Sequence, residues 1–196
     1  RLTSMSDEVG SFYDQHPYPP PAKDLDGYGR HWEDPRRRRA DYHLHWPDQP
    51  YREGLNIMVA GCGTSQAARH ALRNPANQVT GIDISGKLLA IAEQRKAERK
   101  LDNVEFIKTS LYDERLKAAS FDVVIAFYAL HFFEDLDAVV KRVHALLKPG
   151  GLFISETACL GEKSQMTGKL VRFAGRLGFL PGINLLTTGQ LERALE

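Results

Sequence analysis

Blocks of apolar residues and blocks of mixed, amphipathic residues follow one another along most of the chain. Short apolar runs predict strands at 56–60, 78–82, 103–107, 121–127 and 152–157. Amphipathic segments predict helices near 65–74, 86–99, 135–147 and 163–178. Within 135–147 the apolar residues recur three or four positions apart, which places them on one face of a helix.

The order of these elements predicts the fold class α/β. Strands such as 123–127 are apolar throughout, which is typical of parallel strands covered by helices on both faces. Right-handed crossovers make such a sheet doubly wound. In sheets of this kind a ligand binds beyond the carboxyl ends of the strands, where the strand order reverses.

The first 54 residues form a separate segment. They contain seven of the ten prolines, both tryptophans and a run of four arginines, with little periodicity. Ser6 is expected to begin a short helix through Tyr13, and Asp34 to cap a helix that reaches Trp46. Residues 16–21 must be extended because each residue before a proline avoids the helical region. We expect 1–54 to be an extension, either a lid over a ligand or a strap on the back of the sheet.

Residues 55–196 are expected to form the main domain. Thr187 and Gln190 have the spacing of a capping box, which predicts a helix over 191–196. The chain stops before that helix leads into further strands. We therefore expect a sheet of at least five strands that is incomplete at its C-terminal end.

Charge and composition exclude several classes of protein. There are 26 basic and 25 acidic residues, and this net charge of +1 gives no field that favours nucleic acid or a membrane. No apolar run approaches the ~20 residues of a membrane span, and the N-terminus lacks the apolar core of a signal peptide. We expect a soluble, cytoplasmic protein with free thiols at Cys62 and Cys159, because these follow strands two spacings apart.

Two other groups of residues could bind a nucleic acid or a metal ion, but their surroundings in the sequence argue against both. Acidic neighbours flank the arginines at 36–39, so we interpret them as a solvated helix face and expect no nucleic acid partner. His43 and His45 are isolated from other ligand types, and we expect no metal site.

A glycine loop and an acid are the main candidates for ligand binding. Gly61 and Gly63 follow a buried strand, and glycines let the backbone approach a ligand closely. Asp83 ends the next strand, where its carboxylate could accept both hydroxyls of a ribose. We interpret the glycine loop and Asp83 as a binding site for an adenosine-containing ligand. A nicotinamide-binding loop would carry a third glycine at the position of Gln66, which disfavours a dehydrogenase.

The segment from Leu55 to about Glu156 resembles the class I S-adenosylmethionine-dependent methyltransferases. The similarity covers residues 59–64 (glycine loop), 80–85 (acidic strand end), 103–106 (third strand), 121–126 with Leu130 and His131 (fourth strand and its loop), and 146–152 (entry to the fifth strand). The resemblance implies a Rossmann-like sheet, S-adenosylmethionine as cofactor, and methyl transfer to a small molecule or an exposed side chain.

The resemblance also implies a set of cofactor-binding residues: Ala60, Gly61, Cys62, Gly63, Asp83, Ile84, Ser110, Leu111 and Phe127. The loop would contact the methionine part and the ribose, Asp83 the ribose hydroxyls, and Ile84 with residues 110–111 the adenine. Phe127 and Tyr128 would lie near the methyl group. Many members have an acid where this chain has Val59 or Ser110, and a third glycine where it has Ser65.

Each of these assignments has an alternative, either a purely structural role for the residue or another function for the chain. Asp83 could cap a helix, although Ser85 is better placed to do so, and Ser110 could be a simple turn residue. Methyl transfer relies mainly on positioning, worth roughly 7–11 kcal/mol, so no catalytic residue is obligatory. His131 is a candidate base or a packed structural histidine. An NAD(P)-dependent oxidoreductase and a non-catalytic S-adenosylmethionine-binding module are the alternative functions.

Overall fold

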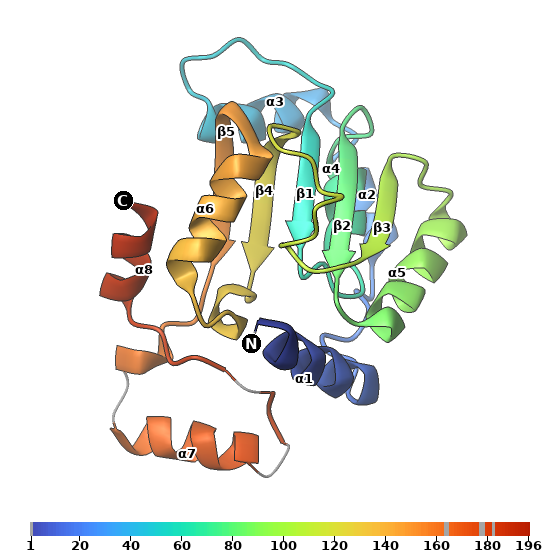
Figure 1. The fold of residues 1–196 in the computed structure, drawn as a ribbon. Coiled ribbons are helices and arrows are strands. Elements are labelled where there is room, and N and C mark those ends of the chain that lie inside the picture. Colours follow the sequence, from blue (N-terminus) through green and yellow to red (C-terminus); the bar gives the residue numbers. More distant parts are fainter. Residues whose placement is uncertain (1, 163–164, 177–178, 182) are drawn as a thin grey trace.

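The computed structural model describes residues 2–162, 165–176, 179–181 and 183–196. Its centre is a five-stranded sheet made of β1 (Asn56–Ala60), β2 (Gln78–Asp83), β3 (Val104–Lys108), β4 (Phe121–Phe127) and β5 (Leu147–Glu156). All pairs are parallel, in the order β3-β2-β1-β4-β5. The strand order reverses between β1 and β4 (Figure 1). The predicted doubly wound, Rossmann-like sheet is confirmed.

Helices cover both faces of this sheet. On one face, α3 (Pro35–His45), α4 (Gln66–Arg73) and α5 (Gly86–Arg99) pack on apolar residues such as Ile57 and Ile125. On the other face, α6 (Leu136–Leu146) and α8 (Thr188–Leu195) pack on residues such as Met58 and Val124. Neighbouring residues of one strand enter different clusters because side chains alternate across a sheet. Two apolar layers therefore hold the strands.

The beginning of β5 differs from the prediction. Helix α6 ends at Leu146, and the strand begins at Leu147 instead of 152. The pairing with β4 is irregular there, because Phe121 pairs with Leu147 and Val123 with Leu152. Residues 148–151 therefore bulge out of the ladder. Gly150 has a φ of +75°, and a Cβ on Gly151 would lie 2.9 Å from the Lys148 carbonyl oxygen.

The N-terminal extension is more helical than the sequence predicts. Helix α1 spans Leu2–Gln15, and α2 (Leu25–His31) was not predicted. Two glycines in α2 hide its helical character, while Asp24 caps it by accepting a hydrogen bond from Gly27 N (2.6 Å). The predicted cap at Asp34 is confirmed by its bond from Arg36 N (2.9 Å).

Helix α1 crosses the carboxyl edge of the sheet, below the ends of β1, β2 and β4 (Figure 1). It lies between α5 and a short 3-10 helix, η1 (Leu130–Phe132). Asp14 accepts hydrogen bonds from Ser85 Oγ (2.6 Å) and Lys87 N (3.1 Å) at the start of α5. Tyr13 meets Phe132 edge-on, with ring centres 6.0 Å apart. The extension thus reaches both the edge of the sheet, through α1, and one face, through α3.

The C-terminal part follows β5 as a second 3-10 helix, η2 (Leu160–Glu162), then α7 (Gln165–Arg176) and α8. Residues 163–164 and 177–178 of the predicted helix 163–178 lie outside the described residues. The capping box is confirmed: Thr187 Oγ1 accepts from Gln190 N (3.2 Å), and Gln190 Oε1 accepts from Thr187 N (2.9 Å). No described helix has the length and apolar character needed to cross a bilayer.

Candidate functional site

The glycine loop and Asp83 meet at the carboxyl edge of the sheet. Gly61 and Gly63 both have positive φ, +65° and +54°, which is strained for any residue with a Cβ. Cys62 N donates to the Ile82 carbonyl (3.0 Å), and Gly63 N donates to Asp83 Oδ2 (2.9 Å). The loop after β1 is therefore tied to the end of β2, and β1 borders the point where the strand order reverses.

Asp83 is a buried acceptor with a raised pKa. Burial raises the pKa of its carboxyl, and the N–H groups of Ser85, Gly63 and Ile84 counter only part of this effect. The nearby charge of Asp14 raises the pKa further. Helix α5 is capped by Ser85, whose Oγ accepts from Leu88 N (3.1 Å), so Asp83 is not that cap. Each carboxylate oxygen can accept a further hydrogen bond beyond its main-chain donor.

Close packing between α4 and β2 is achieved without a third glycine in the loop. Gln66, at the position of that glycine, begins α4. The small residues are instead Ala67 on α4 and Gly81 on β2. A Cβ on Gly81 would lie 2.9 Å from Ala67 Cβ and 3.0 Å from Cys62 Sγ. The sequence signal, an alanine facing a strand glycine, is recognisable only once α4 is known to cross β2.

Four of the predicted cofactor residues have side chains turned into the two apolar layers. Ala60 and Leu111 are buried in the layer under α6, and Cys62 is buried in the layer under α4. Burial, and then the charge of Asp83, raise the pKa of the Cys62 thiol well above its usual value. The ring of Phe127 packs beside His70 of α4, with ring centres 6.4 Å apart. These side chains therefore pack in the apolar layers next to the carboxyl edge of the sheet.

Ile84 and Ser110 lie at the edge itself. Both are half-buried. A Cβ on Gly10 of α1 would lie 3.5 Å from the Ile84 carbonyl oxygen, so α1 covers this residue. The Ser110 carbonyl accepts from Asp113 N (3.2 Å), which makes Ser110 part of a turn after β3. The assignment of cofactor contacts to all these residues stays a prediction.

Two further residues follow β4 at the same edge. Tyr128 is half-exposed with a φ of +54°, and its hydroxyl donates to Glu156 Oε1. This hydrogen bond is the main cause that raises the pKa of Tyr128. The half-buried ring of His131 lies against Phe132, with centres 4.2 Å apart, and burial lowers its pKa. His131 Nδ1 is buried without a hydrogen-bond partner among the described residues.

The extension adds contacts to the glycine loop that no motif in the sequence predicts. Thr64 Oγ1 donates to the Pro19 carbonyl (3.2 Å), and Ser65 Oγ accepts from Ala22 N (3.0 Å). The proline-rich segment thus lies over the glycine loop. Its unusual composition was the only signal in the sequence. Both cysteines are free, and no three His, Cys, Asp or Glu side chains gather into a metal site in the part of the chain that the structure describes.

Comparisons with known proteins agree with this geometry. Residues 58–155 match the family model described as a methyltransferase domain. The chain is 31% identical over 152 residues to the demethylmenaquinone methyltransferase of Chlorobaculum tepidum, covering 76% of this chain and 56% of that protein. It is 32% identical over 133 residues to the enzyme of the same name from Geobacillus kaustophilus, covering 64% of this chain and 54% of that protein. The chain spans about half the length of these curated relatives.

Solved structures show the same fold. The geranyl diphosphate C-methyltransferase of Streptomyces coelicolor, in complex with S-adenosyl-L-homocysteine, superposes with a TM-score of 0.70 at 15% identity. The alignment covers all of this chain and 79% of that one.

The residues at the edge fit the cofactor of these proteins. A carboxylate with spare acceptor capacity suits ribose hydroxyls, and two glycines in left-handed conformation leave the main chain of the loop without side chains at positions 61 and 63. The matched segment, the parallel sheet and this edge point to one conclusion: the chain belongs to the class I S-adenosylmethionine-dependent methyltransferases.

Proposed function

We propose that this chain transfers a methyl group from S-adenosylmethionine to a small-molecule acceptor by in-line displacement. The observation that carries the proposal is the hydrogen bond from Gly63, in the loop after β1, to Asp83 at the end of β2, next to the switch point between β1 and β4. This is where a doubly wound sheet binds its ligand. Relatives named for a menaquinone precursor support an acceptor of small size.

The cofactor, when bound, supplies an electrophilic methyl group already activated by a positive sulfonium. The chain's own residues then have three tasks. Asp83 accepts hydrogen bonds from the ribose hydroxyls, and the main chain at Gly61 and Gly63 contacts the rest of the molecule. The residues after β4 orient the acceptor, because positioning at near-attack distance supplies most of the rate enhancement.

Two side chains can act on the acceptor's proton or its position. The hydrogen bond to Glu156 raises the pKa of Tyr128, so its hydroxyl stays protonated at neutral pH and can orient an acceptor. His131, with its pKa lowered by burial, is neutral at that pH and can accept a proton. We expect His131→Ala to reduce turnover more than cofactor affinity, and unchanged turnover would assign His131 a packing role.

Helix α1 is proposed to act as a lid over Asp83. Burial, and then the charge of Asp83, raise the pKa of Tyr13 on this helix. Asp14 fastens α1 to α5 through Ser85 and Lys87.

The lid is tested by Asp14→Ala, with Glu8→Ala, an exposed position on the same helix, as the matched control. Loss of the Asp14 hydrogen bonds should speed both association and dissociation of S-adenosylhomocysteine several-fold in stopped-flow measurements. A rear strap would instead lose stability and leave both rates unchanged.

Calorimetry with S-adenosylmethionine, S-adenosylhomocysteine and NADH tests the cofactor. The expected result is binding of the first two and none of NADH. Binding of NADH alone would support the oxidoreductase alternative. Binding of S-adenosylhomocysteine without turnover on any small acceptor would support a non-catalytic module.

A further inference from the structure

A cavity of about 420 Å³ lies on the face of the sheet that α3 and α4 cover. Figure 1 shows these two helices behind the sheet. Its floor is apolar and is formed by β4 and β5, with Val123, Ile125 and Ile154 among its residues. Gly61, Gly63 and Asp83 do not line it. The cavity is therefore separate from the glycine loop and Asp83, although Phe127 of β4 and helix α4 border it.

Flat aromatic rings form one wall of this cavity. The rings of Tyr42 and Trp46 are stacked, with centres 4.8 Å apart and an angle of 27° between their planes. Both residues are buried and both line the cavity. Tyr28 of α2 also lines the cavity, and the Arg69 guanidinium lies over its ring, 5.8 Å from the ring centre. A planar ligand can stack on such surfaces.

Positive charge dominates the lining. Four arginines, Arg38, Arg52, Arg69 and Arg73, border the cavity with a single carboxylate, Asp41. Asp41 pairs with Arg73 at 3.3 Å, and Arg52 pairs with Asp122 outside the lining. Arg69 has no ion pair with any carboxylate that the structure describes.

Several donors around the cavity lack an acceptor. Trp46 Nε1, Arg38 Nε and Arg73 Nε are buried without a hydrogen-bond partner among the described residues. All three are N–H groups, so the missing partner is an acceptor. Buried polar groups are normally satisfied, and guanidinium groups favour the planar oxygens of carboxylate and phosphate. His70 agrees with this picture, because burial and then the charges of Arg73 and Arg69 lower its pKa to about 4.

We propose that this cavity is a second ligand site, which binds a small organic anion carrying a flat ring. The arginines receive the anionic group, and Tyr42 with Trp46 packs against the ring. The proposal does not depend on methyl transfer, because the arginines and the stacked rings that carry it are not among the candidate cofactor residues.

The test uses three probes: phenyl phosphate, which has ring and charge, inorganic phosphate, which has charge alone, and phenol, which has the ring alone. Calorimetry without any cofactor measures their affinities. Phenyl phosphate should bind at least tenfold more tightly than either of the other two. Equal affinity for phenol and phenyl phosphate, or no binding of any probe, would overturn the proposal.

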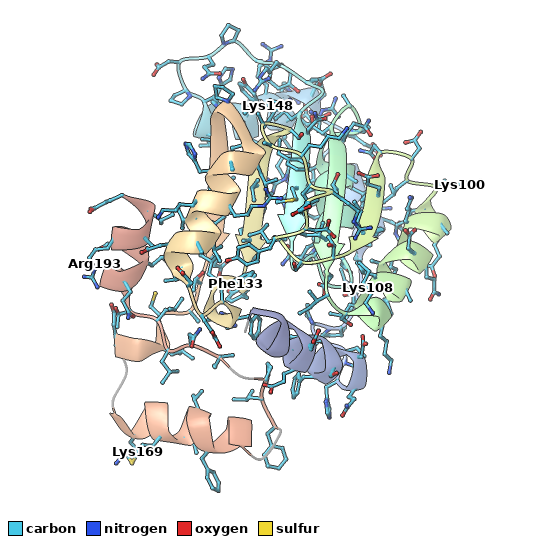
Figure 2. All side chains as sticks on the ribbon, viewed as in Figure 1. Lys100, Lys108, Phe133, Lys148, Lys169 and Arg193 are labelled. Carbon is cyan, nitrogen blue, oxygen red and sulfur yellow. The ribbon has the colours of Figure 1, made fainter. Side chains whose placement is uncertain are left out.

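The location is tested by intrinsic fluorescence and by variants. Trp46 lines the cavity, and the only other tryptophan, Trp32, lies under Arg73 at 4.6 Å, so phenyl phosphate should change the emission of the chain. Arg69→Gln should weaken phenyl phosphate binding about tenfold. Arg193→Gln, an exposed position on α8 labelled in Figure 2, is the control and should leave it unchanged.

A second variant guards against an indirect effect. Trp46→Phe keeps a ring but removes the Nε1 donor, and it too should weaken binding of phenyl phosphate. In the wild-type chain a bound anion should raise the pKa of His70 in an NMR titration. Affinity unchanged in both Arg69→Gln and Trp46→Phe would place the anion elsewhere and refute the site.

Discussion

Asp83 and His70 are both buried titratable residues, and their pKa values are shifted in opposite directions by the same cause. Burial disfavours the charged form of each, which raises the pKa of a carboxyl and lowers that of an imidazole. For Asp83 the consequence concerns binding, because only the ionised carboxylate accepts from both ribose hydroxyls. For His70 the consequence concerns folding.

Replacement of the carboxylate tests the role of Asp83. Asp83→Asn should weaken S-adenosylhomocysteine binding about 10- to 100-fold, the worth of a hydrogen bond to a charged group. Wild-type affinity should fall as the pH drops through the raised pKa of Asp83, and the variant should lack this dependence. Calorimetry at several pH values measures both effects. Asp137→Asn, exposed on α6, is the control, and equal affinities in the two variants would contradict the assignment.

His70 predicts a loss of stability in acid. Its pKa is about 4 in the folded chain against 6.5 in an unfolded one, so between these values only the unfolded state takes up a proton. The contribution of His70 to the free energy of unfolding should therefore be fully present above pH 6.5. It should fall by up to about 3 kcal/mol as the pH approaches 4. Urea unfolding across this range measures it. His70→Gln should flatten the profile, whereas exposed His144→Gln should not.

Close packing between α4 and β2 depends on small residues in both elements, whereas in a nicotinamide-binding loop the third glycine permits it. Gly81→Ala should lower the free energy of unfolding by about 1–3 kcal/mol, because its Cβ would overlap Ala67 and Phe106. Chemical denaturation measures the change. Gly175→Ala in α7, where the nearest atom is 3.9 Å away, should be neutral or slightly stabilising. Equal effects of both substitutions would refute the packing argument.

Across the whole molecule, the two ends of the sheet have different tasks. Figure 2 shows Lys148 at the amino end of the strands and Lys108 at the carboxyl end. At the amino end, Asp122 of β4 accepts from Lys148 Nζ (2.8 Å) and Asn56 N (2.9 Å) and pairs with Arg52 at 3.0 Å. It thereby links β1, β4 and β5 and holds the parallel strands in register.

Asp122→Asn should lower the free energy of unfolding by about 1–3 kcal/mol and leave S-adenosylhomocysteine affinity unchanged, because it acts at the far end from Asp83. Burial alone would raise the pKa of Asp122, but Lys148, Asn56 N and Arg52 lower it overall. Its stabilising effect is therefore present above the unfolded pKa and lost as the pH falls through the folded one. Thermal unfolding measures the loss of stability, and calorimetry measures the affinity for S-adenosylhomocysteine. A large loss of affinity would contradict the view that the amino end of the sheet serves stability alone.

The extent of prediction from sequence differs between the sheet and the extension. Strands 56–60 and 121–127 and the helix 86–99 were predicted with their observed bounds, because buried strands and amphipathic helices have strong local patterns. The start of β5 was misplaced by a bulge at residues 148–151, where glycines permit a ladder irregularity that resembles a turn in sequence. Helix α2 was missed because its stability comes from a cap and from packing on α4.

The sequence by itself determined the parallel sheet, the positions of Gly61, Gly63 and Asp83 at its carboxyl edge, and the family. These depend on short-range patterns that a single chain segment carries. Only the tertiary structure decided that α1 crosses that edge, that the rings of Phe127 and His70 meet on the opposite side from α6, and that arginines from α3 and α4 surround one cavity. Each of these depends on contacts between segments far apart in the chain, which no local periodicity encodes.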